Sequence, residues 1–277
     1  MSMTGTSRQH PARKKAGSAA ALEMKETGTV RRVLILLRCL VDYPGESAQS
    51  LAQRLNLPRS SVHRLLATLR ANDYASNEAN GTFGPGLELY RMAGKLGAQM
   101  PYRKLAEPYL RALSDRFHET SLLTLLVRQQ LKMFHAANGT PDDPMRYDIR
   151  LNSLQPLVWG ATARVMLAHL TDAEIAAAVA GQEPSPVLGL LPDEADIRAS
   201  LQKIRQEGYA ITHSHRTPHT IGIAAPFFNG EGDVVGSLGM LIPEFRWAGV
   251  DPDSVSGALR QAATALSRQL GHAGAAG

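Results

Sequence analysis

Residues 50–70 read SLAQRLNLPRSSVHRLLATLR and decide the fold of the first third of the chain. Apolar side chains recur at helical spacing both before and after Pro58. The first apolar stripe ends at Asn56-Leu57-Pro58, because a residue that precedes proline disfavours helical angles. Pro58 itself suits the first turn of a new helix. The stretch therefore predicts two short helices joined by a tight break.

The second of these helices begins with polar and cationic side chains, in the segment RSSVHR at 59–64. In a helix-turn-helix, the second helix enters the major groove and presents its N-terminal side chains to base edges. The partial positive charge of a helix N-terminus also favours phosphate. An arginine that pairs with guanine adds about 1–3 kcal/mol of discrimination between bases. A packed helical hairpin without a DNA ligand is the alternative interpretation.

The flanking segments extend this helix pair into a winged domain. Apolar spacing predicts a helix from Val30 to Val41, and Asn80-Gly81 between short extended segments predicts a two-stranded wing. We expect a winged helix-turn-helix at 28–86, followed by a linker helix at 87–101. The residues expected to contact DNA are Ser47, Arg59, Ser60, Ser61, His63, Arg64, Arg70, Asn80 and Thr82.

The charge distribution points to a polyanion as the partner of the front of the chain. Residues 1–100 hold 14 Lys and Arg against 7 Asp and Glu, whereas residues 101–277 hold 16 against 18. Positive charge confined to one region is typical of nucleic-acid binding, and we expect a double-stranded DNA operator. Residues 1–27 are expected to be a disordered basic tail that either touches DNA phosphates or has no role.

Cysteine and apolar content constrain the cellular setting. The single cysteine, Cys39, lies in the run VLILLRCLV and is interpreted as a core residue, so an internal disulfide and a Cys-based zinc site are excluded. No apolar run reaches the roughly 18 residues of a membrane-spanning helix. A secretory signal requires an apolar segment after its basic N-terminal residues, and this sequence has none there. We expect a cytoplasmic protein without a membrane partner.

Residues 102–272 predict a second domain of the α+β class. Two late segments, TIGIAAPFF and VVGSLGML, are predicted as a strand pair joined by a turn at 229–232. Further strands are expected at 122–127, 133–136 and 145–151. Helices are expected at 102–117, 159–170, 172–180, 194–207 and 251–270.

Four segments together resemble the IclR family of bacterial transcriptional regulators. The stretch from 50 to 96, which contains LAQRLNLPRSSVHRLLATL, is similar to the family's DNA-binding domain. The segments PLVWGATARVMLAHL, ASLQKIRQEGYAITHSH and GIAAPFFNGEGDVVGSLGM resemble its effector-binding domain. The resemblance implies a C-terminal domain similar to the GAF fold, with an antiparallel sheet. It also implies a homodimer or a dimer of dimers on a palindromic operator, whose DNA affinity a small organic effector modulates.

The resemblance places an effector pocket between the loop before residue 161, the strand after Gly208 and the two late strands. Family members that bind small polar acids carry a cysteine at the position assigned here to Ile223 and an acidic residue at the position of His213. They carry serines at the positions of Met240 and Ile242. We therefore expect an aromatic or otherwise hydrophobic acid, held in part by backbone amides at a helix start; the alternative is an ordinary core without ligand. The expected effector-binding residues are Trp159, Gly160, Ala161, Thr162, His213, Ile223, Met240 and Ile242.

Other functions find less support in the sequence. His213, His215 and His219 form H-x-H-x-x-x-H, but no carboxylate accompanies them, so no metal and no cofactor are expected. The chain has no P-loop, no G-x-S-x-G and no H-E-x-x-H, so no catalytic residues are expected. Two alternatives remain open, namely a constitutive DNA-binding dimer whose C-terminal domain only oligomerises, and an enzyme.

Overall fold

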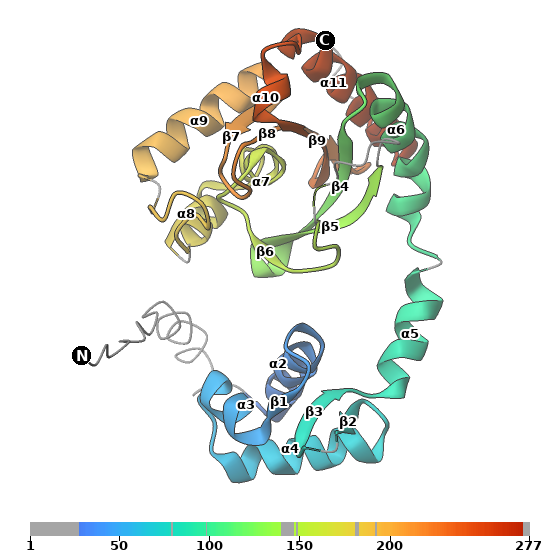
Figure 1. Ribbon diagram of the computed structural model, residues 1–277, viewed down its shortest axis with the longest axis vertical. Coiled ribbons are helices and arrows are strands. Elements are labelled where there is room, and N and C mark those ends of the chain that lie inside the picture. The colour runs from blue at the N-terminus through green and yellow to red at the C-terminus, as the bar shows by residue number, and fades with distance from the viewer. Residues whose placement is uncertain are drawn as a thin grey trace, which may run out of the picture. The chain divides into compact units, whose positions relative to one another are not determined.

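The computed structural model describes residues 28–78, 80–97, 99–139, 147, 149–180, 183–191 and 193–273. The chain divides into two compact units, Met1–Gln99 and Met100–Gly277, each with its own apolar core (Figure 1). The predicted basic tail at 1–27 and residues 145, 146 and 148 of the predicted strand at 145–151 lie outside the described residues. Within those described, no helix combines the length and apolar character needed to cross a bilayer.

The first unit packs helices against a small antiparallel sheet. Its helices are α2 (Thr29–Asp42), α3 (Ala48–Leu55), α4 (Arg59–Ala71) and α5 (Leu87–Gly97), and its strands are β1 (Glu46–Ser47), β2 (Ala75–Asn77) and β3 (Thr82–Pro85). The sheet has three strands in the order β1-β3-β2: β2 and β3 form the predicted hairpin around Asn80-Gly81, and β1 is a third strand that was not predicted. The added strand β1 pairs Glu46 with Phe83 and ties the start of α3 to the wing.

The break between α3 and α4 follows from local chemistry. Asn56 adopts the left-handed conformation at φ 48° and closes α3 with its backbone N–H, and Pro58 then opens α4 at φ −57°. Asparagine tolerates this region better than most residues. The apolar stripe of each helix is thereby turned into the same core, where Leu51 and Leu66 are almost completely buried.

The second unit is built on one antiparallel sheet. Its strands are β4 (Thr120–Val127), β5 (Lys132–Gly139), β6 (Gln155–Pro156), β7 (Ala210–His213), β8 (Thr220–Phe228) and β9 (Val234–Pro243). They lie in the order β6-β5-β4-β9-β8-β7. A 3-10 turn at Arg128–Gln130 joins β4 to β5, and the predicted turn at 229–232 joins β8 to β9. Of the predicted strand at 145–151, the described part shows only a single bridge between Leu151 and His135.

Helices cover both faces of this sheet, so that two apolar cores form. One core lies under α6 (Pro101–Phe117) and α11 (Pro252–Gln269), and the other lies under α7 (Ala161–Leu167), α8 (Asp172–Ala180) and α9 (Glu194–Glu207). A short helix, α10 (Glu244–Trp247), follows β9. The molecule is thus of the predicted α+β class, with a helix-turn-helix unit followed by a unit with a curled antiparallel sheet (Figure 1).

Candidate DNA-binding surface and ligand pocket

The N-terminal part of α4 presents a cationic surface. Val62, Leu65, Leu66 and Leu69 face the core, so the side chains between them point outward. We call the exposed side chains at its start the recognition face; they are Arg59, Ser60, His63 and Arg64. No Asp or Glu occurs between Ala48 and Asn72, so α3 and α4 contribute no negative charge of their own.

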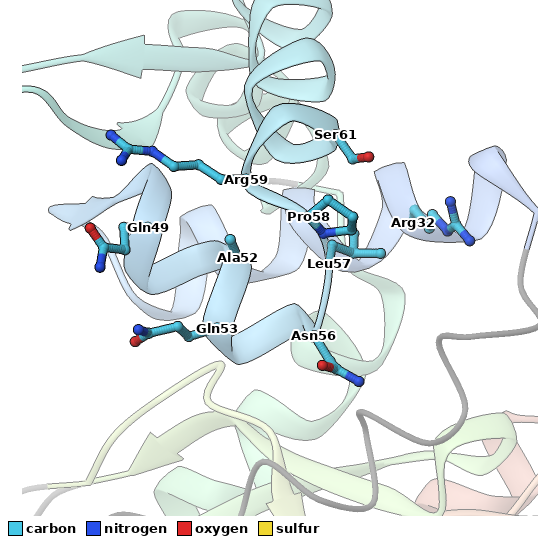
Figure 2. Close-up of a pocket in the computed structure, with 9 residues that line it drawn as sticks. All are labelled: Arg32, Gln49, Ala52, Gln53, Asn56, Leu57, Pro58, Arg59 and Ser61. Carbon is cyan, nitrogen blue, oxygen red and sulfur yellow. The ribbon is translucent and has the colours of Figure 1, made fainter.

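The recognition face borders an open depression of about 870 Å³ (Figure 2). Figure 2 shows Arg59 and Arg32 on either side of Pro58, with Ser61 above the same rim. Gln49 and Gln53 of α3 also line it, and both are exposed. The sequence interpretation missed Arg32, because nothing local in α2 shows that this side chain meets the start of α4.

Among the other predicted DNA-contacting residues, two have structural partners. The hydroxyl of Ser47 accepts a hydrogen bond from the Ser50 backbone N–H (3.1 Å) and caps α3. The hydroxyl of Thr82 donates to the Glu78 carboxylate (3.1 Å), next to the exposed wing residue Asn80. Arg70 is exposed in the last turn of α4, away from the recognition face. The structure thus gathers Arg59, Ser60, Ser61, His63 and Arg64 at one end of α4 and places the rest apart.

The second unit contains a cavity of about 290 Å³ between the sheet and the start of α7, here called the sheet pocket. This volume is near the lower end of the range of about 300–1,000 Å³ for small-molecule sites. Its lining residues are Leu122, His135, Tyr147, Ile149, Arg150, Gln155, Gly160, Ala161, Thr162, Thr212, His215, Arg216, Thr217, Thr220, Gly222, Ile223, Met240 and Leu241. The lining combines apolar side chains, such as Leu122 and Leu241, with polar ones, such as Gln155 and Arg216.

The predicted effector residues are only partly brought together. Gly160, Ala161 and Thr162 line the sheet pocket. Trp159 does not line it; its indole is buried and donates to the Glu183 carbonyl (2.8 Å). His213 is exposed and lies edge-on to Trp247, with ring centroids 6.2 Å apart.

Two of the three residues assigned on the late strands, Ile223 and Met240, border the sheet pocket, and Ile242 does not. Ile223, Met240 and Ile242 are buried in the core under α6 and α11, on the opposite face of the sheet, although Ile223 and Met240 also border the pocket. Their neighbours Gly222 and Leu241, which pair across β8 and β9, also line the pocket. A shift of one residue exchanges the two faces of a strand.

Arg216 is the most unusual group in the sheet pocket. Its side chain lies across Gly160, where an added Cβ would meet the Arg216 Cδ at 3.0 Å. Burial lowers the pKa of the Arg216 guanidinium to about 10, so that it stays charged at neutral pH. Gly160 has φ +87°, a conformation that favours glycine, and its lack of a side chain leaves room for the arginine.

Two histidines beside Arg216 are neutral at pH 7. Burial, followed by the charge of Arg216, lowers the pKa of His135 to about 4, and its Nδ1 lies 2.8 Å from the hydroxyl of Thr124. Burial also lowers the pKa of His215 to about 4, and its Nδ1 accepts from the Gly160 N–H (3.4 Å). The positive charge of the pocket therefore comes from arginine rather than from histidine.

The three histidines considered for a metal site lie in different surroundings. His213 lies against Trp247, His215 against Trp159, and His219 faces the Glu244 carboxylate at 3.2 Å. Among the described residues, no group of three or more His, Cys, Asp and Glu side chains has the geometry to hold a metal ion. Cys39 is buried in the core of the first unit, as its sequence context predicts, and burial raises the pKa of its thiol.

Comparisons with known proteins agree with this architecture. Residues 29–79 match the family described as IclR helix-turn-helix domain, and residues 96–268 match the family described as bacterial transcriptional regulator IclR C-terminal. The HTH-type transcriptional regulator TtgV of Pseudomonas putida is 28% identical over 249 residues, which are 88% of this chain and 92% of TtgV. The regulator KipR of Bacillus subtilis (strain 168) is 24% identical over 245 residues, or 88% of this chain and 97% of KipR.

Solved structures show the same fold. An IclR-type transcriptional regulator from Silicibacter sp. TM1040 superposes with a TM-score of 0.77 at 23% identity, covering 89% of this chain and 97% of the other. An IclR homologue from Microbacterium hydrocarbonoxydans, in complex with 4-hydroxybenzoate, gives a TM-score of 0.68 at 20% identity, covering 88% and 99%. The two family matches together span most of the described residues. The chain therefore belongs to the IclR family, whose members are DNA-binding regulators of transcription rather than enzymes.

Proposed function

We propose that this chain is a ligand-responsive repressor or activator that reads an operator with α4 and changes its operator affinity when a small organic acid occupies the sheet pocket. The observation that carries this proposal is the exposed recognition face, in a helix-turn-helix unit that precedes a unit with a pocket of small-molecule size. It acts in the cytoplasm, where bacterial DNA is found. A constitutive DNA-binding protein would have the same first unit, but would not need the pocket.

The DNA contacts divide into two roles. Arg64 lies on the recognition face one turn into α4, where a helix in the major groove places side chains against base edges. Arg59 and Arg32 flank the depression at Pro58 and serve phosphate, together with the hydroxyls of Ser60 and Ser61. Phosphate contacts fix the register on the duplex, whereas the base contact specifies sequence.

The effector is proposed to be an aromatic acid. The IclR homologue bound to 4-hydroxybenzoate has the same fold as this chain, and the sheet pocket combines apolar side chains such as Leu122 and Leu241 with arginine. A single aromatic ring fills a pocket near 290 Å³ better than an extended ligand does. The smallest acids, such as glyoxylate, would leave the apolar wall without contact.

The operator complex is proposed to contain a homodimer or a dimer of dimers. Helix α5 has no buried residue, and its exposed side chains include Leu87 (79%), Tyr90 (62%) and Leu96 (62%). Leu87 and Tyr90 share one side of the helix and Leu96 lies on another, so apolar surface is exposed on more than one side of α5. Exposed apolar surface of this kind typically marks a contact with another chain. A second copy of the same helix is the proposed partner, and the resulting dimer would provide two recognition helices for a palindromic operator.

Sedimentation equilibrium of the wild-type chain and of a Leu96→Glu variant tests self-association through α5. Only the wild type is expected to self-associate.

Operator affinity measured with and without ligand tests the central proposal. A fluorescently labelled duplex, selected by this protein from a random pool, is titrated with protein in the absence of ligand and in 1 mM benzoate, 4-hydroxybenzoate or glyoxylate. We expect the aromatic acids, and not glyoxylate, to change the Kd at least about fivefold, since couplings of about 1–3 kcal/mol are typical. A Kd that no acid changes would favour the constitutive alternative.

Base reading is tested on the same duplex. Arg64→Gln is expected to weaken binding by about 1–3 kcal/mol and to relax preference at one base pair of each half-site. Arg198→Gln is the matched control, because Arg198 is an exposed arginine paired with Glu194 on α9, outside both the recognition face and α5. Equal losses for Arg64→Gln and Arg198→Gln would argue against α4 as the reading helix.

A further inference from the structure

Arg216 is half-buried, with its stem against Gly160 and its guanidinium in the lining of the sheet pocket, and no partner for it is found within the described part of the chain. Only burial contributes to the fall in its pKa, and no carboxylate compensates for it. None of the described residues that line the sheet pocket is Asp or Glu. A buried charge without a counterion is costly to the folded state, because the lost hydration is not replaced. Such a cost is typical of a residue in a functional site, where a bound ligand supplies the missing counterion.

A second group in the same pocket is also unsatisfied. The amide oxygen of Gln155, on the edge strand β6, is buried and accepts no hydrogen bond from the described residues. Backbone pairing between Gln155 and Met133 of β5 fixes its position. Buried acceptors are almost always hydrogen-bonded in folded proteins. An O–H or N–H donor from a bound molecule would satisfy this oxygen.

Arg216 and Gln155 together define complementary chemistry. A carboxylate is the usual partner of an arginine fork, which it binds through two parallel hydrogen bonds. The neutral histidines His135 and His215 add no charge, so selection for an anion depends on arginine. Arg150, the other arginine of the lining, is exposed, whereas Arg216 lies deep enough for burial to shift its pKa.

We propose that Arg216 and Gln155 form the specificity site of the sheet pocket, and that the effector is a compact carboxylate that also carries a hydroxyl group. The carboxylate pairs with the Arg216 guanidinium, and the hydroxyl donates to the Gln155 amide oxygen. The apolar side chains Leu122 and Leu241 contact the body of the molecule between these two groups. This inference rests on the proposed function, since it takes the occupant of the pocket to be the effector.

Isothermal titration of the full chain with matched probes tests the site. The probes are 3-hydroxybenzoate, 4-hydroxybenzoate, benzoate and 4-hydroxybenzamide, which retain or lack one of the two groups. The variants are Arg216→Met, which keeps the aliphatic stem over Gly160, and Gln155→Leu. Arg260→Met is the control, because Arg260 is an arginine of α11 that does not line the pocket.

Each predicted loss of binding affinity follows from one missing contact between the probe and the pocket. Wild type is expected to bind at least one hydroxybenzoate about 2- to 10-fold more tightly than benzoate, and the amide about 10- to 100-fold more weakly than the acid. Gln155→Leu removes only the preference for the hydroxyl, and Arg216→Met removes the preference for the acid. Arg260→Met binds as wild type does.

Thermal unfolding separates this role from a structural one. Removal of a buried, uncompensated charge is expected to keep or raise the Tm of Arg216→Met without ligand, and to abolish the rise in Tm that hydroxybenzoate produces in wild type. A lower Tm together with unchanged ligand affinity would identify Arg216 as a structural residue and overturn the proposal.

The outcomes distinguish the site from the proposed function. If Arg216→Met binds the acids as wild type does, or if wild type binds 4-hydroxybenzamide as tightly as the acid, the specificity site is wrong while ligand control of DNA binding stands. If wild type binds none of the probes, the hydroxy-acid assignment is overturned, and the operator titrations still decide whether the chain reads DNA.

Discussion

Acid is expected to destabilise the second unit through His135. The pKa of His135 is lowered by burial from 6.5 to about 4, and the side chain is 8% exposed. Below pH 6.5 the unfolded chain binds a proton at this position, whereas the folded chain does not until the pH approaches 4. The free energy of unfolding therefore falls as the pH is lowered through this window, by about 1.4 kcal/mol per pH unit. Between about pH 7.5 and pH 5, His135 alone accounts for a loss of about 2 kcal/mol.

Urea unfolding followed by tryptophan fluorescence measures this loss. Both tryptophans of the chain, Trp159 and Trp247, lie in the second unit, so the signal reports on that unit alone. His135→Gln retains a hydrogen-bonding group near Thr124 but does not titrate, so this variant is expected to lose about 2 kcal/mol less between the two pH values. His213→Gln, at an exposed position, is the control and is expected to behave as wild type does. The reasoning is refuted if wild type and His135→Gln lose the same stability on acidification.

Three further substitutions probe the fold and the pocket. Leu66→Ala empties a fully buried position of the first unit and is expected to cost about 2–5 kcal/mol, measured by circular dichroism during urea unfolding. Ser47→Ala removes the cap of α3, for a loss of about 1 kcal/mol in the same assay. Gly222→Val fills the floor of the sheet pocket, where an added Cβ already lies 3.3 Å from the Thr212 hydroxyl, and is expected to abolish ligand binding in calorimetry while operator affinity persists.

Each of these predictions has an outcome that contradicts it. Unchanged stability of Leu66→Ala would mean that α4 does not pack on the core through its predicted stripe. Unchanged stability of Ser47→Ala would leave its hydroxyl available for DNA, as the sequence interpretation supposed. Ligand binding by Gly222→Val at wild-type affinity would place the ligand outside the sheet pocket.

The helix-turn-helix was predictable because its signals are local. The apolar stripe that contains Leu51 and Leu66 repeats at helical spacing, and Pro58 marks the boundary between the helices. The strands β1 and β6 were not predicted, because a strand of two residues has no periodicity to detect. The pairing of β1 with β3 is a tertiary contact, which only the folded unit shows.

The sequence indicated where the pocket lies but not every residue that lines it. Residues of β8 and β9 are buried on both faces, so their sequences TIGIAAPFF and VVGSLGML lack the polar alternation that would tell one face from the other. The assignment therefore named Ile223, which borders the pocket, and did not include its neighbour Gly222, which also lines it. Arg216 was overlooked because it lies in a loop, and its burial results from contact with Gly160, which is distant in sequence.

The salt dependence of operator binding tests the central claim, that the start of α4 contacts duplex DNA, most directly. Each phosphate contact that is lost lowers the slope of log K against log salt concentration by about 0.9. Anisotropy titrations of wild type, Arg59→Gln and the Arg198→Gln control, each at several salt concentrations, give this slope. The account predicts a slope shallower by about 0.9 for Arg59→Gln and an unchanged slope for Arg198→Gln. Identical slopes and affinities for all three proteins would contradict it.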